Sequence, residues 1–387
     1  MAARKYAYIN PAMLKWARGE TPFASISDVV TRRPKYTYEQ IAAWENGDAF
    51  PSITEAKDLA ALYDVPFACL FFTVIPNKKP RPYTDRRTAY AHIASEVSYE
   101  LWREIRRITT NREIALDTDV EFFTNVEPLP VIRHNEDITS VAAKIRSYLG
   151  VTTPFRYKKQ YGNSAFNYFR SIFENKNIMI AQITGVSVSE IRGLSIYNDI
   201  IPIIAVNGGD WERAKVFTLF HEMAHLLRRS SSLCLIDFDE QNDDEEKMFD
   251  KIAAEALLPE TPFRKIVSEM AISATGWDDI SLLDVADKFA VSTVVVLRRL
   301  YDLKIINFDY YVLRYKEMEA AVAEQAKNKK SFPVDYHYKY LNQQGYLFPK
   351  IMLSAYANGT ISYGEMCRSL NVNTMHIGNI EQVVMFR

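Results

Sequence analysis

The sequence is poor in cysteine and has no excess of charge of either sign. Its 387 residues include three widely spaced cysteines, Cys69, Cys234 and Cys367, with no C-x-x-C pair. This excludes a disulfide framework and favours a reducing compartment. Lys and Arg number 47 against 48 Asp and Glu, a formal net charge of −1. Such a chain has no overall attraction to nucleic acid or to an anionic membrane, so any such binding needs a local patch.

Long apolar runs are also missing. The sequence contains no apolar run of the roughly 18 residues that a membrane-spanning helix needs. Its start, MAARKYAY, has no continuous apolar segment of signal-peptide length. We therefore expect a cytoplasmic protein without a membrane segment. A hydrophobic content of 48% over 387 residues is enough for two or more globular cores.

Histidine is scarce too, yet two of the six histidines stand four residues apart in the sequence HEMAH at positions 221–225. The residues around them, 216–227, are mostly apolar and predict a buried helix. On a helix, His221 and His225 lie on one face, so both imidazole rings can reach the same metal ion. This is the H-E-x-x-H arrangement of zinc peptidases, in which the glutamate, here Glu222, is the general base. The alternative is a core helix with two hydrogen-bonded histidines.

A catalytic zinc site needs a third protein ligand and one open position. The acidic stretch 239–246 offers several candidates, and helical phase separates them, because residues from about 244 to 258 have a helical pattern. At about 100° per residue, Glu246 starts an inward-facing stripe that includes Asp250, whereas Glu255 lies about 180° away. The sequence therefore predicts Glu246 as the third ligand.

Asp250 lies one helical turn after Glu246, on the same stripe. A carboxylate in this position can accept the other ring N–H of a ligating histidine and fix its tautomer. The alternative is a surface aspartate that pairs with Lys247 or Lys251. We favour the histidine contact because Asp250 shares the stripe of the predicted ligand.

These motifs together resemble a known family. The HEMAH motif, combined with EKMFDKIAAEALLP at 246–259, resembles the ImmA/IrrE family of zinc metallo-endopeptidases. The family pattern has asparagine where this chain has Asp250, and the Glu-x-x-x-Asp spacing also resembles that of thermolysin-type enzymes. The resemblance implies a zincin-like peptidase domain that binds Zn²⁺. It also implies a target, namely a specific helix-turn-helix transcriptional repressor whose cleavage relieves repression in a phage or stress response.

The first 75 residues predict a small helical domain. We expect short helices from Pro11 onward, over 37–47, 53–63 and 66–72, with a less regular piece at 22–33. Counting that piece as the second helix, the chain has five short helices with a W-E-x-G at the end of the third, and this pattern resembles a phage-repressor-type (XRE-like) helix-turn-helix domain. In the ImmA/IrrE family such a domain often precedes the peptidase.

DNA binding by this domain would be weak. The helix over 37–47 offers Tyr38 and Gln40 to base edges, near basic Arg32, Arg33 and Lys35, but it also carries Glu39 and Glu45. A helical module that holds or senses a protein partner is an equally good interpretation.

The remainder of the chain predicts an α+β, mostly helical fold. Strands are expected at 178–183, 193–196 and 200–207, followed by an N-cap at Asp210 and, after the HEMAH helix, a polar loop over 228–245. Pro202 indicates an edge strand or a strand start, and an edge strand before the HEMAH helix could pair with an extended substrate. An ordinary covered edge is the alternative.

We therefore expect four parts. They are a helix-turn-helix-like domain at 1–75, a Pro-rich linker at 76–90, the peptidase domain at 91–270 and a C-terminal helical domain at 271–387 with a helix-turn-helix-like segment at 280–305.

Two other functions stay open. The chain could be a DNA-binding regulator whose zinc site has lost activity, although the intact motif with Glu222 argues against this. It could also be a toxin–antitoxin-type partner that acts by binding without proteolysis, which nothing in the sequence excludes.

Overall fold

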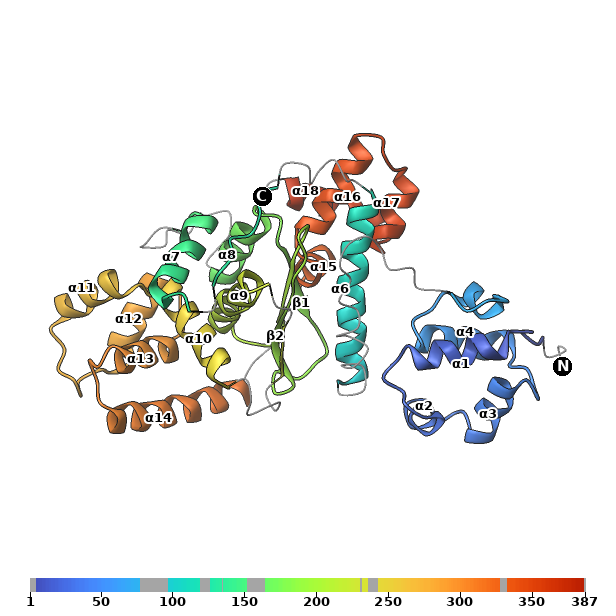
Figure 1. The fold of residues 1–387 in the computed structure, drawn as a ribbon, viewed down its shortest axis with the longest axis horizontal. Helices are drawn as coiled ribbons and strands as arrows, with labels where there is room; N and C mark the ends of the chain where they lie inside the picture. Colours follow the sequence, from blue (N-terminus) through green and yellow to red (C-terminus); the bar gives the residue numbers. More distant parts are fainter. Residues whose placement is uncertain are drawn as a thin grey trace. The chain divides into compact units, whose positions relative to one another are not determined.

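The computed structural model describes residues 5–76, 97–118, 126–133, 135–151, 164–229, 232–235, 243–327 and 333–385. The chain forms two compact units, Met1–Arg107 and Ile108–Arg387 (Figure 1). Apart from Pro76, the predicted linker lies outside the described residues, as do residues 236–242 of the acidic stretch. The four-part division predicted from the sequence stays a prediction.

The first unit is built from short helices that enclose a small apolar core. Its core includes Leu14, Ile41, Trp44 and Leu59. The helical elements are α1 (Pro11–Gly19), α2 (Ile26–Arg32), α3 (Tyr38–Asn46), α4 (Ile53–Leu62), the 3₁₀ helix η1 (Phe67–Phe71) and the first part of α6 (Tyr99–Thr118).

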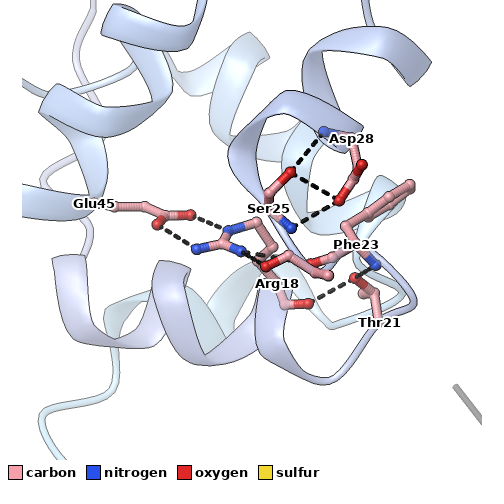
Figure 2. Close-up of polar contacts among 7 residues, drawn as sticks. Arg18, Thr21, Phe23, Ser25, Asp28 and Glu45 are labelled. Carbon is pink, nitrogen blue, oxygen red and sulfur yellow. Dashed lines mark hydrogen bonds and ion pairs between the residues drawn. The ribbon is translucent and has the colours of Figure 1, made fainter. Parts of the chain in front are cut away.

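Helix α2 lies within the less regular piece predicted at 22–33. Ser25 and Asp28 form a capping box at its start (Figure 2). The backbone N–H of Asp28 donates to Ser25 Oγ at 3.3 Å, and the backbone N–H of Ser25 donates to Asp28 Oδ2 at 2.7 Å. These bonds satisfy two backbone groups that a helix end leaves without partners. A helix of seven residues held in this way gives little apolar periodicity to recognise.

A buried ion pair joins α1 to α3 (Figure 2). Arg18 Nε and Nη2 donate to the two carboxylate oxygens of Glu45 at 2.8 and 3.0 Å. Arg18 Nη1 also donates to the carbonyls of Phe23 and Ala24 at 3.4 and 3.3 Å, which holds the segment before α2. Glu45 is only 8% exposed, so it is an internal connection of the unit and not an acidic group on the surface of α3.

The second unit has the predicted α+β, mostly helical fold around a four-stranded sheet. The strands are β1 (Met179–Ile183), β2 (Ile191–Ile196), β3 (Ile203–Asn207) and β4 (Ser232–Leu235), in the order β1-β3-β2-β4. β1 and β3 are parallel, whereas β2 is antiparallel to both β3 and β4. The three strands expected from their β-branched residues are confirmed.

Of the two interpretations of Pro202, the strand start is confirmed and the edge strand was wrong, and the loop expected at 232–235 was also wrong. β3 is not an edge strand, because it pairs with β1 on one side and β2 on the other. Pro202 precedes the strand, so its missing N–H costs no sheet hydrogen bond, while its carbonyl accepts from the N–H of Met179 at 2.8 Å. Residues 232–235, expected within a loop, form β4 against β2.

The helices of the second unit surround this sheet. Figure 1 shows α8 and α9 on one side of the sheet and α15 on the other. Side chains from α7 to α14 share one apolar core with the sheet. The helices that follow α6 are α7 (Ile138–Leu149), α8 (Ala165–Glu174), α9 (Glu212–Leu227), α10 (Asp243–Leu257), α11 (Glu260–Met270), α12 (Asp279–Phe289), α13 (Thr293–Asp302), α14 (Phe308–Lys327), α15 (Tyr336–Gln344), α16 (Leu347–Ala357), α17 (Tyr363–Leu370), the 3₁₀ helix η4 (Thr374–His376) and α18 (Ile377–Met385). Across the described part of the chain, no helix combines the length and apolarity that crossing a membrane requires.

The C-terminal helices are anchored to α8 by two buried charged side chains. Arg170 is 1% exposed, donates to the carbonyls of Leu341 and Asn342 at 3.2 and 3.3 Å, and lies over the ring of Tyr346. Glu174 accepts from the backbone N–H of Tyr346 at 2.7 Å. The turn between α15 and α16 is therefore an integral part of the second unit.

Candidate metal centre

Helix α9 carries the HEMAH residues into the interior of the second unit. Every side chain from Thr218 to Leu227 is buried, because the helix packs against β2, β3, α8 and α10. The helix begins one residue later than predicted, with Trp211 as its N-cap. Asp210 is not the cap, because its Oδ1 accepts from the adjacent N–H of Trp211 at 2.8 Å and not from an N–H of the first helical turn.

Three side chains from α9 and α10 meet at one point. His221 Nε2 lies 3.2 Å from His225 Nε2 and 3.1 Å from Glu246 Oε2, and His225 Nε2 lies 3.4 Å from Glu246 Oε1. Within the described residues this is the one group of three or more His, Cys, Asp or Glu side chains with ligand atoms close enough to hold a metal ion. The structure thus brings together the three residues that the sequence predicts as ligands.

The spacing of these atoms fits a tetrahedral zinc ion. Zinc binds histidine nitrogen and carboxylate oxygen at about 2.0–2.1 Å, so neighbouring ligand atoms around a tetrahedral ion lie about 3.3 Å apart. The separations of 3.1, 3.2 and 3.4 Å between His221, His225 and Glu246 match this value. Two nitrogens and one carboxylate also form a donor set typical of catalytic zinc, which leaves a fourth position open.

The charge state of Glu246 suits a cation. Burial alone would raise the pKa of its carboxyl group, but hydrogen bonds from His221 and His225 outweigh this effect and hold the pKa well below its usual range. Glu246 is therefore an ionised carboxylate at neutral pH, as a metal ligand must be.

Two residues of α10 orient the imidazole rings. Asp250 Oδ1 lies 2.9 Å from His221 Nδ1, and this contact places the ring proton on Nδ1 and leaves the Nε2 lone pair directed at the other ligand atoms. Phe249 packs against both imidazoles, with ring centroids 4.3 Å from His225 and 6.2 Å from His221. The contact of Asp250 is the one favoured from the sequence, whereas the role of Phe249 was not foreseen.

The competing acids have other partners. Glu255 is 7% exposed and pairs with the buried Arg299. Glu245 pairs with Arg228, with Oε1 3.1 Å from Nε. The helical phase of α10 therefore separates Glu246 from both of its acidic neighbours.

Glu222 stands apart from the three clustered residues. It is fully buried on α9, and its Oε1 faces β2, where a side-chain carbon on Gly193 would lie 2.9 Å away. This contact was not predicted from the sequence. A glycine inside an apolar strand is the signal that could have revealed it, because such a glycine often marks a close approach.

One comparison with known proteins gave a match. Residues 163–301 match the Peptidase_M78 family model, described as an IrrE N-terminal-like domain. The matched segment contains α8, the sheet, α9 and α10, and hence the whole candidate centre. It supports a relationship to the ImmA/IrrE family and a metallopeptidase activity, and the mostly helical fold with a small sheet agrees with a zincin-like domain. Neither the curated proteins nor the solved structures gave a significant match.

Proposed function

We propose that the protein is a zinc-dependent endopeptidase in which His221, His225 and Glu246 bind the metal. The observation that carries this proposal is the convergence of their three donor atoms at separations of 3.1–3.4 Å, from two helices, inside a segment that matches a metallopeptidase family. Two neutral imidazoles and one carboxylate carry a single negative charge, so a divalent cation bound to them would keep a net positive charge and could polarise a substrate carbonyl.

Glu222 and Asp250 have separate roles in the proposed reaction. Held by His221, His225 and Glu246, a zinc ion would lower the pKa of a bound water molecule to about 7 and would polarise the scissile carbonyl. Glu222 takes the proton from the attacking water and delivers it to the nitrogen of the leaving amine. Its burial on α9, next to His221 in the chain, keeps the carboxylate out of bulk solvent. Asp250 holds the ring of His221 in the tautomer that binds metal.

We further propose that the substrate is a helix-turn-helix repressor, cleaved in the cytoplasm to relieve repression. The motifs at 221–225 and 246–259 support this target through their resemblance to the ImmA/IrrE family. The helical first unit is the natural candidate for recognising the target, because the proposed chemistry lies entirely in the second unit. Free thiols at Cys69 and Cys367 agree with a reducing compartment.

The experiment is mass analysis of the repressor encoded near this protein, before and after incubation with the zinc-loaded chain. The proposal predicts two fragments from one cut, and no fragments with Glu222→Gln. Two alternatives predict other outcomes. A toxin–antitoxin-type partner gives a stable complex with intact repressor, and a DNA-binding regulator gives sequence-specific DNA binding that does not need Glu222.

A further inference from the structure

Gly193 is the residue of β2 that comes closest to α9. A Cβ at this position would lie 2.3 Å from Thr218 Cγ2, 2.9 Å from Glu222 Oε1 and 3.3 Å from the carbonyl oxygen of Ala205. Contacts shorter than 3.0 Å require the neighbouring atom to move. Side-chain atoms of Thr218 and Glu222 thus occupy the space that a side chain on Gly193 would need.

The two side chains that face Gly193 differ in how easily they can move. Thr218 is β-branched and its Oγ1 donates to the carbonyl of Ala214 at 3.2 Å, which fixes the direction of Cγ2. Glu222 Oε1 is the far end of a flexible side chain, so the carboxylate can shift within the interior, although Glu222 is fully buried. Helix α9 itself cannot shift easily, because all of its side chains from Thr218 to Leu227 are buried.

Gly193 is held just as firmly on its own side. It pairs with Val206 of β3 and with Cys234 of β4, so it lies between two neighbouring strands. The pairing with β4 shifts register between Ile191 and Gly193, an irregularity of the kind that re-aims a strand locally. A substitution at Gly193 is therefore accommodated mainly by displacement of Thr218 and Glu222.

We propose that Gly193 is a positioning residue for Glu222, and that the missing side chain sets where the carboxylate stands relative to the bound metal. This inference rests on the proposed peptidase function, because the position of Glu222 matters for chemistry only if Glu222 moves the proton. A misplacement of about 1 Å in such a group costs about 10²-fold in rate.

The test separates a packing effect from an effect on Glu222. In Gly193→Ala the added methyl group clashes with both Thr218 Cγ2 and Glu222 Oε1. In the double variant Gly193→Ala/Thr218→Ala, Thr218 Cγ2 is absent, so the methyl group clashes only with Glu222 Oε1. We expect the double variant to match Thr218→Ala in Tm and in zinc affinity measured by chelator competition. Its kcat on the repressor cleaved by the wild-type protein should nonetheless stay about 10²-fold below that of Thr218→Ala, with KM unchanged.

A crystal structure of the metal-free double variant gives a second readout that needs no activity. The carboxylate of Glu222 should be displaced from its wild-type position by about 1 Å. Gly364→Ala serves as the control, because an added Cβ there meets nothing within 4 Å.

The outcomes distinguish this inference from the proposed function. If wild type cleaves, Glu222→Gln does not, and the double variant cleaves as well as Thr218→Ala with an unmoved carboxylate, the role of Gly193 is overturned while the peptidase stands. If wild type does not cleave, the proposed function fails and the inference fails with it.

Discussion

His221 Nδ1 lies 2.9 Å from Asp250 Oδ1, so the first HEMAH histidine is held by a carboxylate one helical turn after Glu246. The same helix, α10, thus supplies a proposed zinc ligand and the group that orients another. Such a carboxylate fixes the tautomer that binds metal and raises the basicity of the ring. The centre is therefore a four-residue arrangement across two helices.

Removing this carboxylate should weaken metal binding. We expect Asp250→Ala to lower zinc affinity by about 10–100-fold, and Asp250→Asn to lower it less, because the amide oxygen can still accept from His221 Nδ1. Chelator competition measures both, with the exposed Asp309→Ala on α14 as a control. Equal zinc affinity in Asp250→Ala and wild type would reduce Asp250 to a surface residue.

Glu246 and Glu245 form a matched pair for testing the third ligand. They are adjacent in sequence, but Glu246 joins the two histidines while Glu245 pairs with Arg228. Glu246→Ala should sharply lower zinc occupancy, since three protein ligands leave little redundancy, and Glu245→Ala should leave it intact. Elemental analysis decides between them. Full zinc in Glu246→Ala would show that the ligand is another residue.

Helical phase was sufficient to predict that Glu246 and Asp250 lie near His221, because these positions depend on the regular geometry of two helices. It could not locate β4 or place β3 in the middle of the sheet, since strand order depends on contacts between segments far apart in the sequence. Pro202 was ambiguous for the same reason. A proline outside a sheet ladder and one on an edge strand look alike in sequence.

Local hydrogen bonds of polar side chains are the second reason why the structure differs from the elements predicted from the sequence. The capping box of Ser25 and Asp28 builds α2 without a long apolar pattern, and the carboxylate of Asp210 bonds the next amide instead of capping α9. The approach of Gly193 to Glu222 arises only when the strand and the helix are packed together. Sequence patterns predict elements, whereas these details depend on the assembled backbone.

The ion pair of Arg18 and Glu45 should control the stability of the first unit without affecting the metal centre. Glu45→Ala leaves the partly buried guanidinium of Arg18 without its carboxylate, a loss of about 1–3 kcal/mol. Hydrogen exchange of the full chain should therefore accelerate in α1 and α3 and stay unchanged in α9 and α10. The exposed Glu39→Ala on α3 is the control. Unaltered exchange in α1 and α3 would contradict the structural role of this pair.

Gly345, in the turn before α16, requires glycine for two reasons, whereas Gly359, just after α16, requires it for only one. Both have positive φ, +79° and +73°, which strains any larger residue. A Cβ on Gly345 would also lie 2.0 Å from the carbonyl oxygen of Ile180, whereas one on Gly359 meets nothing within 4 Å. Gly345→Ala should therefore lower the Tm of the full chain more than Gly359→Ala. Equal losses would mean that the turn does not pack against β1 as described.

The most direct test of the central claim is repressor cleavage by zinc-loaded Glu222→Gln, measured together with its zinc content and its binding to the repressor. Glu222 is not among the clustered ligand atoms, so the variant should keep its zinc and its partner. It should lose the general base, and cleavage should fall by at least about 10²–10⁴-fold. Cleavage at the wild-type rate, or relief of repression in cells equal to that of the wild type, would contradict a proteolytic function.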